Sequence, residues 1–277
     1  MAVPEIIRVL CLGDLVGRPG RRVLRECLGP VRAEHAIDFV ICNVENATNG
    51  AGTRPKEADE ILSYGVDCMT NGDHIVDHPE IYDYLAREPR LLRPLNFPLL
   101  GKGAHTYTIA QGRAAGVRVG VASVCGQVFM KGPPNTQGAM MAIEPNIKRL
   151  RDETPLIFVD VHAEATSEKV AMGWFLDGKV SGVFGTHTHV QTADNQVLPQ
   201  GTGYITDLGM TGPHLGVIGR DKDMVLERFK TGERRFLKVA RDWTRMCGAI
   251  FDVETATGKC RNVSLFSHQL QAPPEDE

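Results

Sequence analysis

Two apolar runs flank a helix-like stretch in the N-terminal part of the chain. The first, IIRVLCL at residues 6–12, is partly β-branched and stops at Gly13, and the second lies within DFVICNVENA at residues 38–47. A continuous apolar run bounded by glycine or polar residues predicts a strand that is buried on both faces. Residues 21–34, between the two runs, predict a helix. Strand, helix and strand in this order predict a parallel pair, so we expect an α/β fold.

Further predicted strands and helices alternate along the rest of the chain. Residues 56–64 predict a helix, and strand-like VDCMTNGDH follows it. After Pro94 the sequence becomes richer in short predicted strands: HTYTIA, VRVGVASVC, PLIFVDVHA, VSGVFGTHT and GYITDLG. Residues 144–151 and 167–176 predict helices, and the glycine- and proline-rich segment between VRVGVASVC and the first of them predicts a long surface loop.

Length and composition set the expected domain organisation and partners. A chain of 277 residues can bury one large core, so we expect a single domain over residues 1–269 and a disordered tail over 270–277. The net charge of −3 favours no duplex nucleic-acid surface, and no long apolar run predicts a membrane span. Seven scattered cysteines without a CxxC pair predict reduced thiols in a cytoplasmic protein. Assembly into a homo-oligomer is left open.

Oxygen-bearing side chains follow the first three predicted strands, where each strand ends. Asp14 follows the first, Glu45 and Asn46 the second, and Asp73 the third. The carboxyl ends of strands open onto the ligand crevice in α/β sheets, so these side chains are expected to face one site. Any one of them alone is explained equally well as a turn or cap residue.

Histidines supply the nitrogen half of the predicted site. His162 lies in DVHAEAT, and His187 and His189 form an HxH pair in GTHTH. Two residues at i and i+2 share one face of an extended backbone, and neutral imidazole is a common ligand of transition metals. A mixed imidazole and carboxylate set fits Mn, Fe or Zn, and it holds more ligands than one ion needs. The sequence therefore predicts a binuclear hydrolase site, as used for phosphoester displacement.

The order of these motifs resembles that of the calcineurin-like metallophosphoesterase superfamily, and more closely its bacterial YmdB-like branch of cyclic-nucleotide phosphodiesterases. The motifs are GDLVG, NVENATNGAG, TNGDH, DVHAEATSEK and GTHTHVQTAD, and the likeness continues through GQVFM, TDLGMTGP and GVIGRDKDMVLERFKTG. The resemblance implies a four-layer helix/sheet/sheet/helix sandwich. It also implies a small phosphodiester substrate, with 2′,3′- and 3′,5′-cyclic nucleotides both open.

The resemblance further implies a role for each site residue. Two divalent transition-metal ions are implied, with Fe or Mn favoured over Zn, and a metal-bridging hydroxide would attack phosphorus. His74 would assist the leaving oxygen, and Glu45 would bridge the ions. One ion would be held by Asp14, Glu45, Asn46 and His189, and the other by Glu45, Asp73, His162 and His187.

One departure from the family pattern supports an alternative function, and the HxH pair leaves a second alternative open. The family usually shows GNH where this chain reads Gly72, Asp73 and His74, and Ile75 to Asp77 also differ from the aromatic expected there. An extra carboxylate should hold a cation more tightly but repel an anionic ester. The departure is the best support for a non-catalytic, metal-containing regulator that binds a nucleotide or RNA. A metal-dependent amidohydrolase also uses HxH, although there the pair lies near the first strand.

Overall fold

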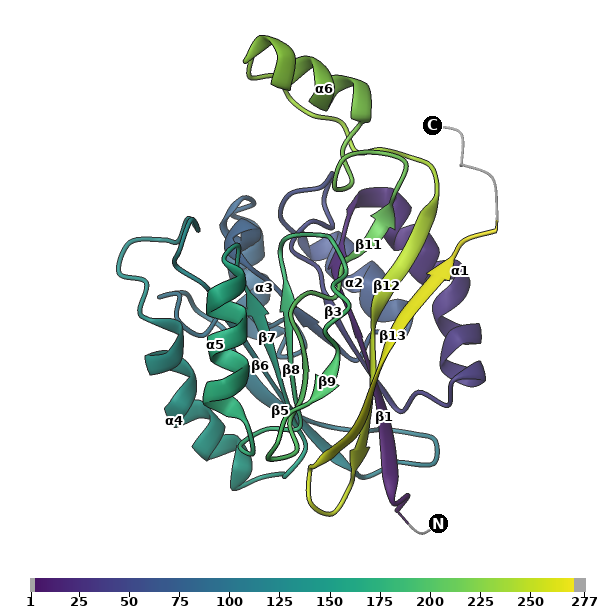
Figure 1. The fold of residues 1–277 in the computed structure, drawn as a ribbon, viewed down its shortest axis with the longest axis vertical. Coiled ribbons are helices and arrows are strands. Elements are labelled where there is room, and N and C mark those ends of the chain that lie inside the picture. Colours follow the sequence, from purple (N-terminus) through teal and green to yellow (C-terminus); the bar gives the residue numbers. More distant parts are fainter. Residues whose placement is uncertain (1–2, 272–277) are drawn as a thin grey trace.

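A computed structural model describes residues 3–271 and arranges them in two β-sheets, one of seven strands and one of six, with helices on both sides (Figure 1). Of the predicted disordered tail, residues 272–277 lie outside the described residues. Leu270, by contrast, donates a backbone hydrogen bond to Thr244 and packs against the core. The predicted mixed α/β class is confirmed.

The seven-stranded sheet contains the predicted N-terminal β-α-β unit. β1 (Ile6–Leu12) pairs in parallel with β3 (Phe39–Asn43), which pairs in parallel with β4 (Cys68–Thr70). The other edge of β1 pairs with β12 (Thr244–Glu254), which the sequence analysis did not predict. Three further strands that it did not predict extend the sheet: β13 (Cys260–Gln269) and β11 (Met210–Pro213) pair with β12, and the short β2 (Asp14–Leu15) pairs with β11.

The six-stranded sheet holds the five strands predicted after Pro94. β6 (Arg118–Cys125), β7 (Ile157–His162), β8 (Gly182–Thr186) and β10 (Gly203–Ile205) run parallel to one another. β5 (Ala104–Thr108) and β9 (Gln196–Val197) are antiparallel at the two edges.

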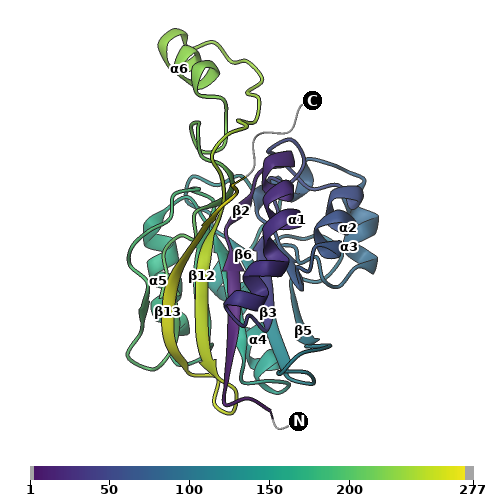
Figure 2. The ribbon, with the colours of Figure 1, turned by 90° about the vertical axis from the view of Figure 1, so that its right-hand side faces the viewer.

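The helices pack on the outer faces of the two sheets. Figure 2 shows α1 (Gly17–Glu34), α2 (Pro55–Ser63) and α3 (Ile81–Arg87) on one side and α5 (Thr166–Leu176) on the other. In α1 a buried stripe at helical spacing, Val23, Leu24, Cys27, Leu28 and Val31, faces the sheet.

The helix predicted over residues 144–151 begins earlier than expected. α4 spans Ala139–Arg151, so Pro145 lies inside it. A proline inside a helix removes one backbone hydrogen bond, so a helix that continues through Pro145 needs support from packing. The buried side chains Ala142 and Ile143 lie before the proline, and their burial helps to hold this first turn in helical form.

Three apolar cores hold these elements together. The middle core lies between the sheets, where Val9 of β1 and Phe251 of β12 meet Phe158 of β7. The second packs α1 against the outer face of the first sheet, and the third packs α4 and α5 against the second sheet. β1 contributes alternate residues to two cores, as a strand buried on both faces must.

An arm that contains α6 (Lys222–Thr231) projects away from the body (Figures 1 and 2). Its helix starts at an Asp221 cap, whose side chain accepts a hydrogen bond from the Met224 backbone, and ends at Gly232 with a φ of 74°. None of the helices within residues 3–271 has the length and apolarity needed to cross a membrane.

Candidate metal centre

All the predicted ligands lie at or just beyond strand ends, in both sheets. Asp14 begins β2, Glu45 and Asn46 lie in the buried turn after β3, and Asp73 begins the 3-10 helix η1 (Asp73–Val76) that follows β4. His162 is the last residue of β7, and His187 directly follows β8. Because β1, β3, β7 and β8 end at the same level, residues far apart in sequence meet between the sheets.

Four of the predicted ligands form one compact group. Ligand atoms of Glu45, Asp73, His162 and His187 lie within 4.8 Å of one another. His162 Nε2 lies 3.0 Å from Glu45 Oε2, 3.4 Å from Asp73 Oδ1 and 3.0 Å from His187 Nδ1. This group could hold one metal ion.

The remaining three predicted ligands lie together beside that group. His189 Nε2 is 3.0 Å from Asn46 Oδ1 and 3.8 Å from Asp14 Oδ1. Asp14 also contacts the first group, because its Oδ2 accepts a hydrogen bond from the His187 backbone at 3.0 Å. The structure therefore brings together all seven side chains that the sequence analysis selected as ligands.

In each ligand histidine, the ring nitrogen that points away from the centre faces a hydrogen-bond acceptor. His162 Nδ1 lies 2.9 Å from Thr186 Oγ1, His187 Nε2 lies 3.1 Å from Glu164 Oε2, and His189 Nδ1 lies 3.0 Å from the Ile218 carbonyl oxygen. In a neutral imidazole one nitrogen carries the proton and the other accepts. Protons placed toward these acceptors leave lone pairs on His162 Nε2, His187 Nδ1 and His189 Nε2, which all point into the centre.

Two features show that this donor set fits a cation. His162 Nε2 and His187 Nδ1 would face each other as lone pairs at 3.0 Å, an arrangement that a proton or a metal ion must relieve. Asp14 Oδ1 and Asp73 Oδ1 are also buried atoms for which the described residues provide no hydrogen-bond partner. A buried carboxylate oxygen without a partner is costly, and a bound cation would satisfy it.

The charges of the centre shift its pKa values strongly. Burial opposes protonation of His162, but Glu45, Asp73 and Asp14 raise its pKa well above the ordinary value. Burial likewise opposes ionisation of Asp73, but His162, His74 and His187 lower its pKa to about 2. Burial and the neighbouring His162 lower the pKa of His187. Without a cation, the carboxylates thus concentrate a proton on His162, at the position that a metal ion would take.

His74 lies at the rim of the centre rather than inside it. Its Nδ1 is 2.7 Å from Asp77 Oδ2, and its backbone N–H points at Glu45 Oε2 at 3.4 Å. The side chain is 38% exposed, so it can reach a bound ligand. Burial works against protonation, but Glu45, Asp73 and Asp77 outweigh it and raise the pKa of His74. A partly exposed, protonated imidazole beside a metal centre suits a general acid.

The backbone around the centre is tightly constrained. His187 and His189 have φ values of 97° and 64°, which residues other than glycine rarely adopt. Gly72 precedes Asp73, and a β-carbon there would lie 2.2 Å from His162 Nε2. Only glycine therefore leaves room for the ligands at this position.

Several residues that support the centre were not found from the sequence. Glu164 and Thr186 contact ligand histidines, and Asp160 lies behind Thr186. Asp160 and Glu164 lie two residues from His162, and Thr186 is next to His187. Their closeness in sequence to predicted ligands could therefore have identified them. Ile218 contributes only a backbone carbonyl, for which a sequence carries no signal.

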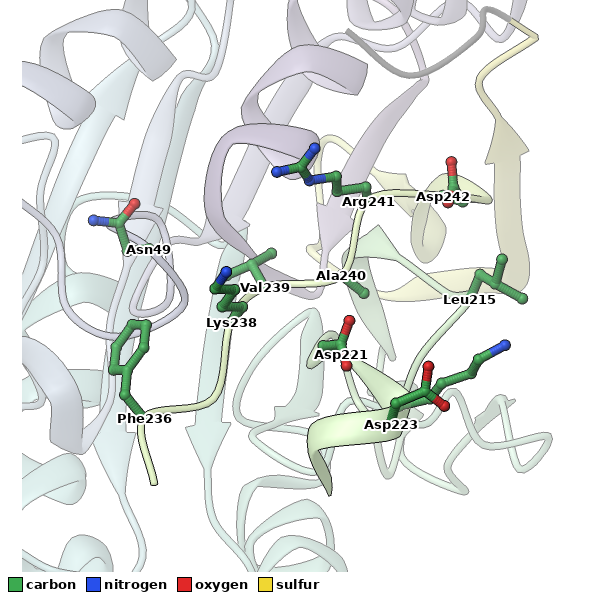
Figure 3. Close-up of a pocket in the computed structure, with 11 residues that line it drawn as sticks. Asn49, Leu215, Asp221, Asp223, Phe236, Lys238, Val239, Ala240, Arg241 and Asp242 are labelled. Atoms are coloured by element: carbon green, nitrogen blue, oxygen red, sulfur yellow. The ribbon is translucent and has the colours of Figure 1, made fainter. Parts of the chain in front are cut away.

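Cavities open at the root of the α6 arm, and one of them reaches a candidate ligand. One of about 590 Å³ is bounded by Asn49 and Phe236 on one side and by Leu215 and Asp223 on the other (Figure 3). A second, of about 280 Å³, is lined by His189 itself together with Ile218. There is therefore room for a small molecule next to the candidate ligands.

Comparisons with known proteins give a consistent picture. A family described as "YmdB-like protein" matches residues 10–266. A Bacillus subtilis (strain 168) protein named "2',3'-cyclic-nucleotide 2'-phosphodiesterase" is 41% identical over 255 residues, which cover 91% of this chain and 94% of the relative. The crystal structure of a novel phosphatase from Mycoplasma pneumoniae is similar with a TM-score of 0.86 and 30% identity, covering 95% and 94% of the two chains. The crystal structure of a hypothetical protein from Thermus thermophilus has a TM-score of 0.84 and 34% identity, covering 95% and 99%.

Proposed function

This chain belongs to the YmdB-like protein family, and from that premise we propose that it is a metal-dependent phosphodiesterase. The family resemblance expected from the sequence is thereby confirmed, and similar proteins carry the names of phosphodiesterase or phosphatase. The observation that supports the proposal most directly is that three histidine ring nitrogens and two buried carboxylate oxygens, which have no hydrogen-bond partner among the described residues, lie together in one centre.

The proposed centre holds two divalent transition-metal ions, with Fe or Mn favoured over Zn. Asp14, Asn46 and His189 would hold one ion and Asp73, His162 and His187 the other, with Glu45 shared. When bound, such ions activate water and neutralise charge on a phosphoryl group. The constrained turns at Gly72 and His187 keep the ligand atoms in place before the ions arrive.

His74 is proposed to donate a proton to the leaving oxygen. Asp77 accepts from Nδ1 and so fixes the ring, which leaves Nε2 to face a bound ester. The raised pKa of His74 keeps it protonated at higher pH than a free histidine. General acid assistance of this kind contributes about 10²–10⁴-fold in rate.

A cyclic nucleotide is the proposed substrate class. The name of the 41% identical relative favours a 2′,3′-cyclic nucleotide, and the 3′,5′-cyclic form is the second candidate. We further propose a single domain with the helix/sheet/sheet/helix architecture of metallophosphoesterases, supported by the three cores described above. All seven cysteines lie among the described residues as buried free thiols, which supports a cytoplasmic location.

The two alternative functions, an amidohydrolase and a non-catalytic regulator, require different structural features. Residues 3–271 form two open-ended sheets, which disfavours an amidohydrolase because that superfamily is built on a barrel. A non-catalytic regulator would need the same metal centre, and the extra carboxylate of Asp73 is the observation that favours it. Turnover measurements distinguish it from an enzyme.

The test combines metal analysis with kinetics on the purified full-length chain. Wild-type protein should hold close to two transition-metal ions per chain and hydrolyse bis-p-nitrophenyl phosphate and 2′,3′-cyclic AMP. His74→Ala should keep the metal and lose about 10²–10⁴-fold in turnover. Arg235→Ala, in an exposed ion pair on the segment that returns from the α6 arm, is the matched control and should keep both. Fully active protein without metal would refute the proposal, and tight nucleotide binding without turnover would favour the regulator.

A further inference from the structure

A buried polar network lies directly behind His162. Asp160, two residues earlier on β7, is fully buried. Its Oδ2 accepts hydrogen bonds from Thr70 Oγ1 at 2.5 Å and from Asn43 Nδ2 at 2.9 Å, and its Oδ1 accepts one from Thr186 Oγ1 at 2.7 Å. The Thr186 hydroxyl is in turn 2.9 Å from His162 Nδ1. The Asp160 carboxylate, the Thr186 hydroxyl and the His162 imidazole therefore form one continuous relay of hydrogen bonds.

The chemistry of the groups fixes the direction of this relay. A carboxylate only accepts, so the Thr186 hydroxyl gives its single proton to Asp160. Its lone pairs are then left for His162, and Nδ1 must be the protonated nitrogen that donates to them. Asn43 is consistent with this direction, because its Oδ1 accepts from the Glu45 backbone at 3.1 Å, and its Nδ2 donor lies closer to Asp160 Oδ2, at 2.9 Å, than to His162 Nδ1, at 3.4 Å.

We propose that Asp160 and Thr186 are positioning residues that set the tautomer of His162. With the proton held on Nδ1, the lone pair of Nε2 points at Glu45 and Asp73, in the form that binds a metal ion. This inference rests on the proposed function and adds to it the residues that prepare one ligand. His187 and His189 are oriented by other groups, Glu164 and a backbone carbonyl, so the relay acts on His162 alone.

Burial of a carboxylate at this place argues for such a role. The partners of Asp160 among the described residues are two hydroxyls and an amide, with His162 beyond them. A neutral asparagine could fill nearly the same space without the cost of burying a charge. An asparagine, however, would place an N–H₂ donor against Thr186 whenever its amide nitrogen replaced Oδ1. The Thr186 proton would then turn toward His162 Nδ1, and the proton of His162 would move to the metal-binding nitrogen.

The test measures Mn²⁺ binding to the full chain by isothermal titration and by electron paramagnetic resonance, without any activity assay. Thr186→Val and Asp160→Asn should each weaken Mn²⁺ affinity by about 10–100-fold, the usual effect of removing a partner of a ligand histidine. Thr186→Ser keeps the hydroxyl and should stay within about threefold of wild type. Thr202→Val is the control, because it removes another fully buried hydroxyl. Thr202 directly precedes β10, and its hydroxyl donates to the Val180 carbonyl.

The outcomes separate this inference from the proposed function. Thr186→Val with the wild-type affinity would overturn the inference while leaving the proposed function intact. A wild-type protein that binds none of Mn²⁺, Fe²⁺ and Zn²⁺ would overturn both. If Thr186→Val fails to fold, ¹⁵N spectra of the imidazoles in the Zn²⁺-loaded wild-type protein test the tautomer of His162 directly. A protonated His162 Nδ1 in slow exchange is expected, and ligation through Nδ1 would refute the proposal.

Discussion

Replacing Lys169 by methionine should destabilise the protein strongly, because it breaks an ion pair buried beneath the metal centre. Lys169 Nζ of α5 lies 2.7 Å from Asp207 Oδ2, and each side chain is only 1% exposed. Asp207 Oδ2 also accepts from the Thr188 hydroxyl at 2.7 Å, and Thr188 lies between His187 and His189. The pair therefore anchors the turn that presents both histidines.

The size of the effect follows from what remains around Asp207. Removing one partner of a buried ion pair costs about 3–5 kcal/mol, because the other charge stays buried without compensation. Asp207 would keep the Thr188 hydroxyl and the Gly209 backbone N–H, which donates to Oδ1 at 2.8 Å. We therefore expect a loss near the lower end, about 3 kcal/mol in the free energy of unfolding.

Urea unfolding of metal-free wild type and Lys169→Met measures this loss. Arg235→Met is the control, since its pair with Glu233 has side chains 65% and 58% exposed and should contribute about 0–1 kcal/mol. In a double-mutant cycle, Lys169→Met with Asp207→Asn should cost clearly less than the sum of the single changes. A loss below about 1 kcal/mol for Lys169→Met would refute the reasoning, because a buried charge left unpaired cannot be that cheap.

Three further predictions concern the centre itself. Gly72→Ala should abolish Mn²⁺ binding, because a β-carbon there would lie 2.0 Å from His162 Cδ2 and 2.3 Å from Glu45 Oε2. A titration that shows Mn²⁺ binding with near wild-type affinity would contradict this prediction. Asp73→Asn should weaken Mn²⁺ affinity several-fold and raise turnover of bis-p-nitrophenyl phosphate, since it removes a negative charge that attracts the cation and repels the ester. No change in either quantity would show that the extra charge affects neither metal binding nor turnover. Burial raises the pKa of Asp160 from 3.8 to about 6, so below about pH 6 the folded protein binds a proton at Asp160 more tightly than the unfolded chain does, and this contribution to stability is lost as the pH rises through about 6 and Asp160 becomes a carboxylate. The unfolding free energy of metal-free Asp160→Asn relative to metal-free wild type should therefore increase between about pH 5 and about pH 7.5 in urea titrations, and a difference independent of pH would count against the shift.

The strands and helices with strong local patterns were predictable from the sequence. The N-terminal β-α-β unit and the parallel strands β6, β7 and β8 were expected because continuous apolar runs ended at glycine or polar residues. The hairpin of β12 and β13 was not expected, although alternate residues Ala249, Phe251 and Val253 face the middle core. No turn signal in the sequence linked β12 to β1, and these two paired strands lie more than 200 residues apart.

The ligand types were also predictable, because they depend on chemistry that each motif carries by itself. Carboxylates after apolar runs and an HxH pair indicated a metal site before any contact was known. The long-range partners of those ligands were not predictable in the same way. Asn43, for example, reaches Asp160 across 117 positions of sequence.

The sequence by itself therefore determined which side chains could bind a metal and at which strand ends they would lie. Only the tertiary structure decided that the ends of β3 and β4 in one sheet meet the ends of β7 and β8 in the other, and which nitrogen of each histidine faces the centre. The physical reason is that a ligand's identity is local, whereas its position and tautomer depend on packing and hydrogen bonds between distant segments. Asp160 and Thr186 show this plainly, since the direction of their hydrogen bonds becomes visible only when both sheets are in place.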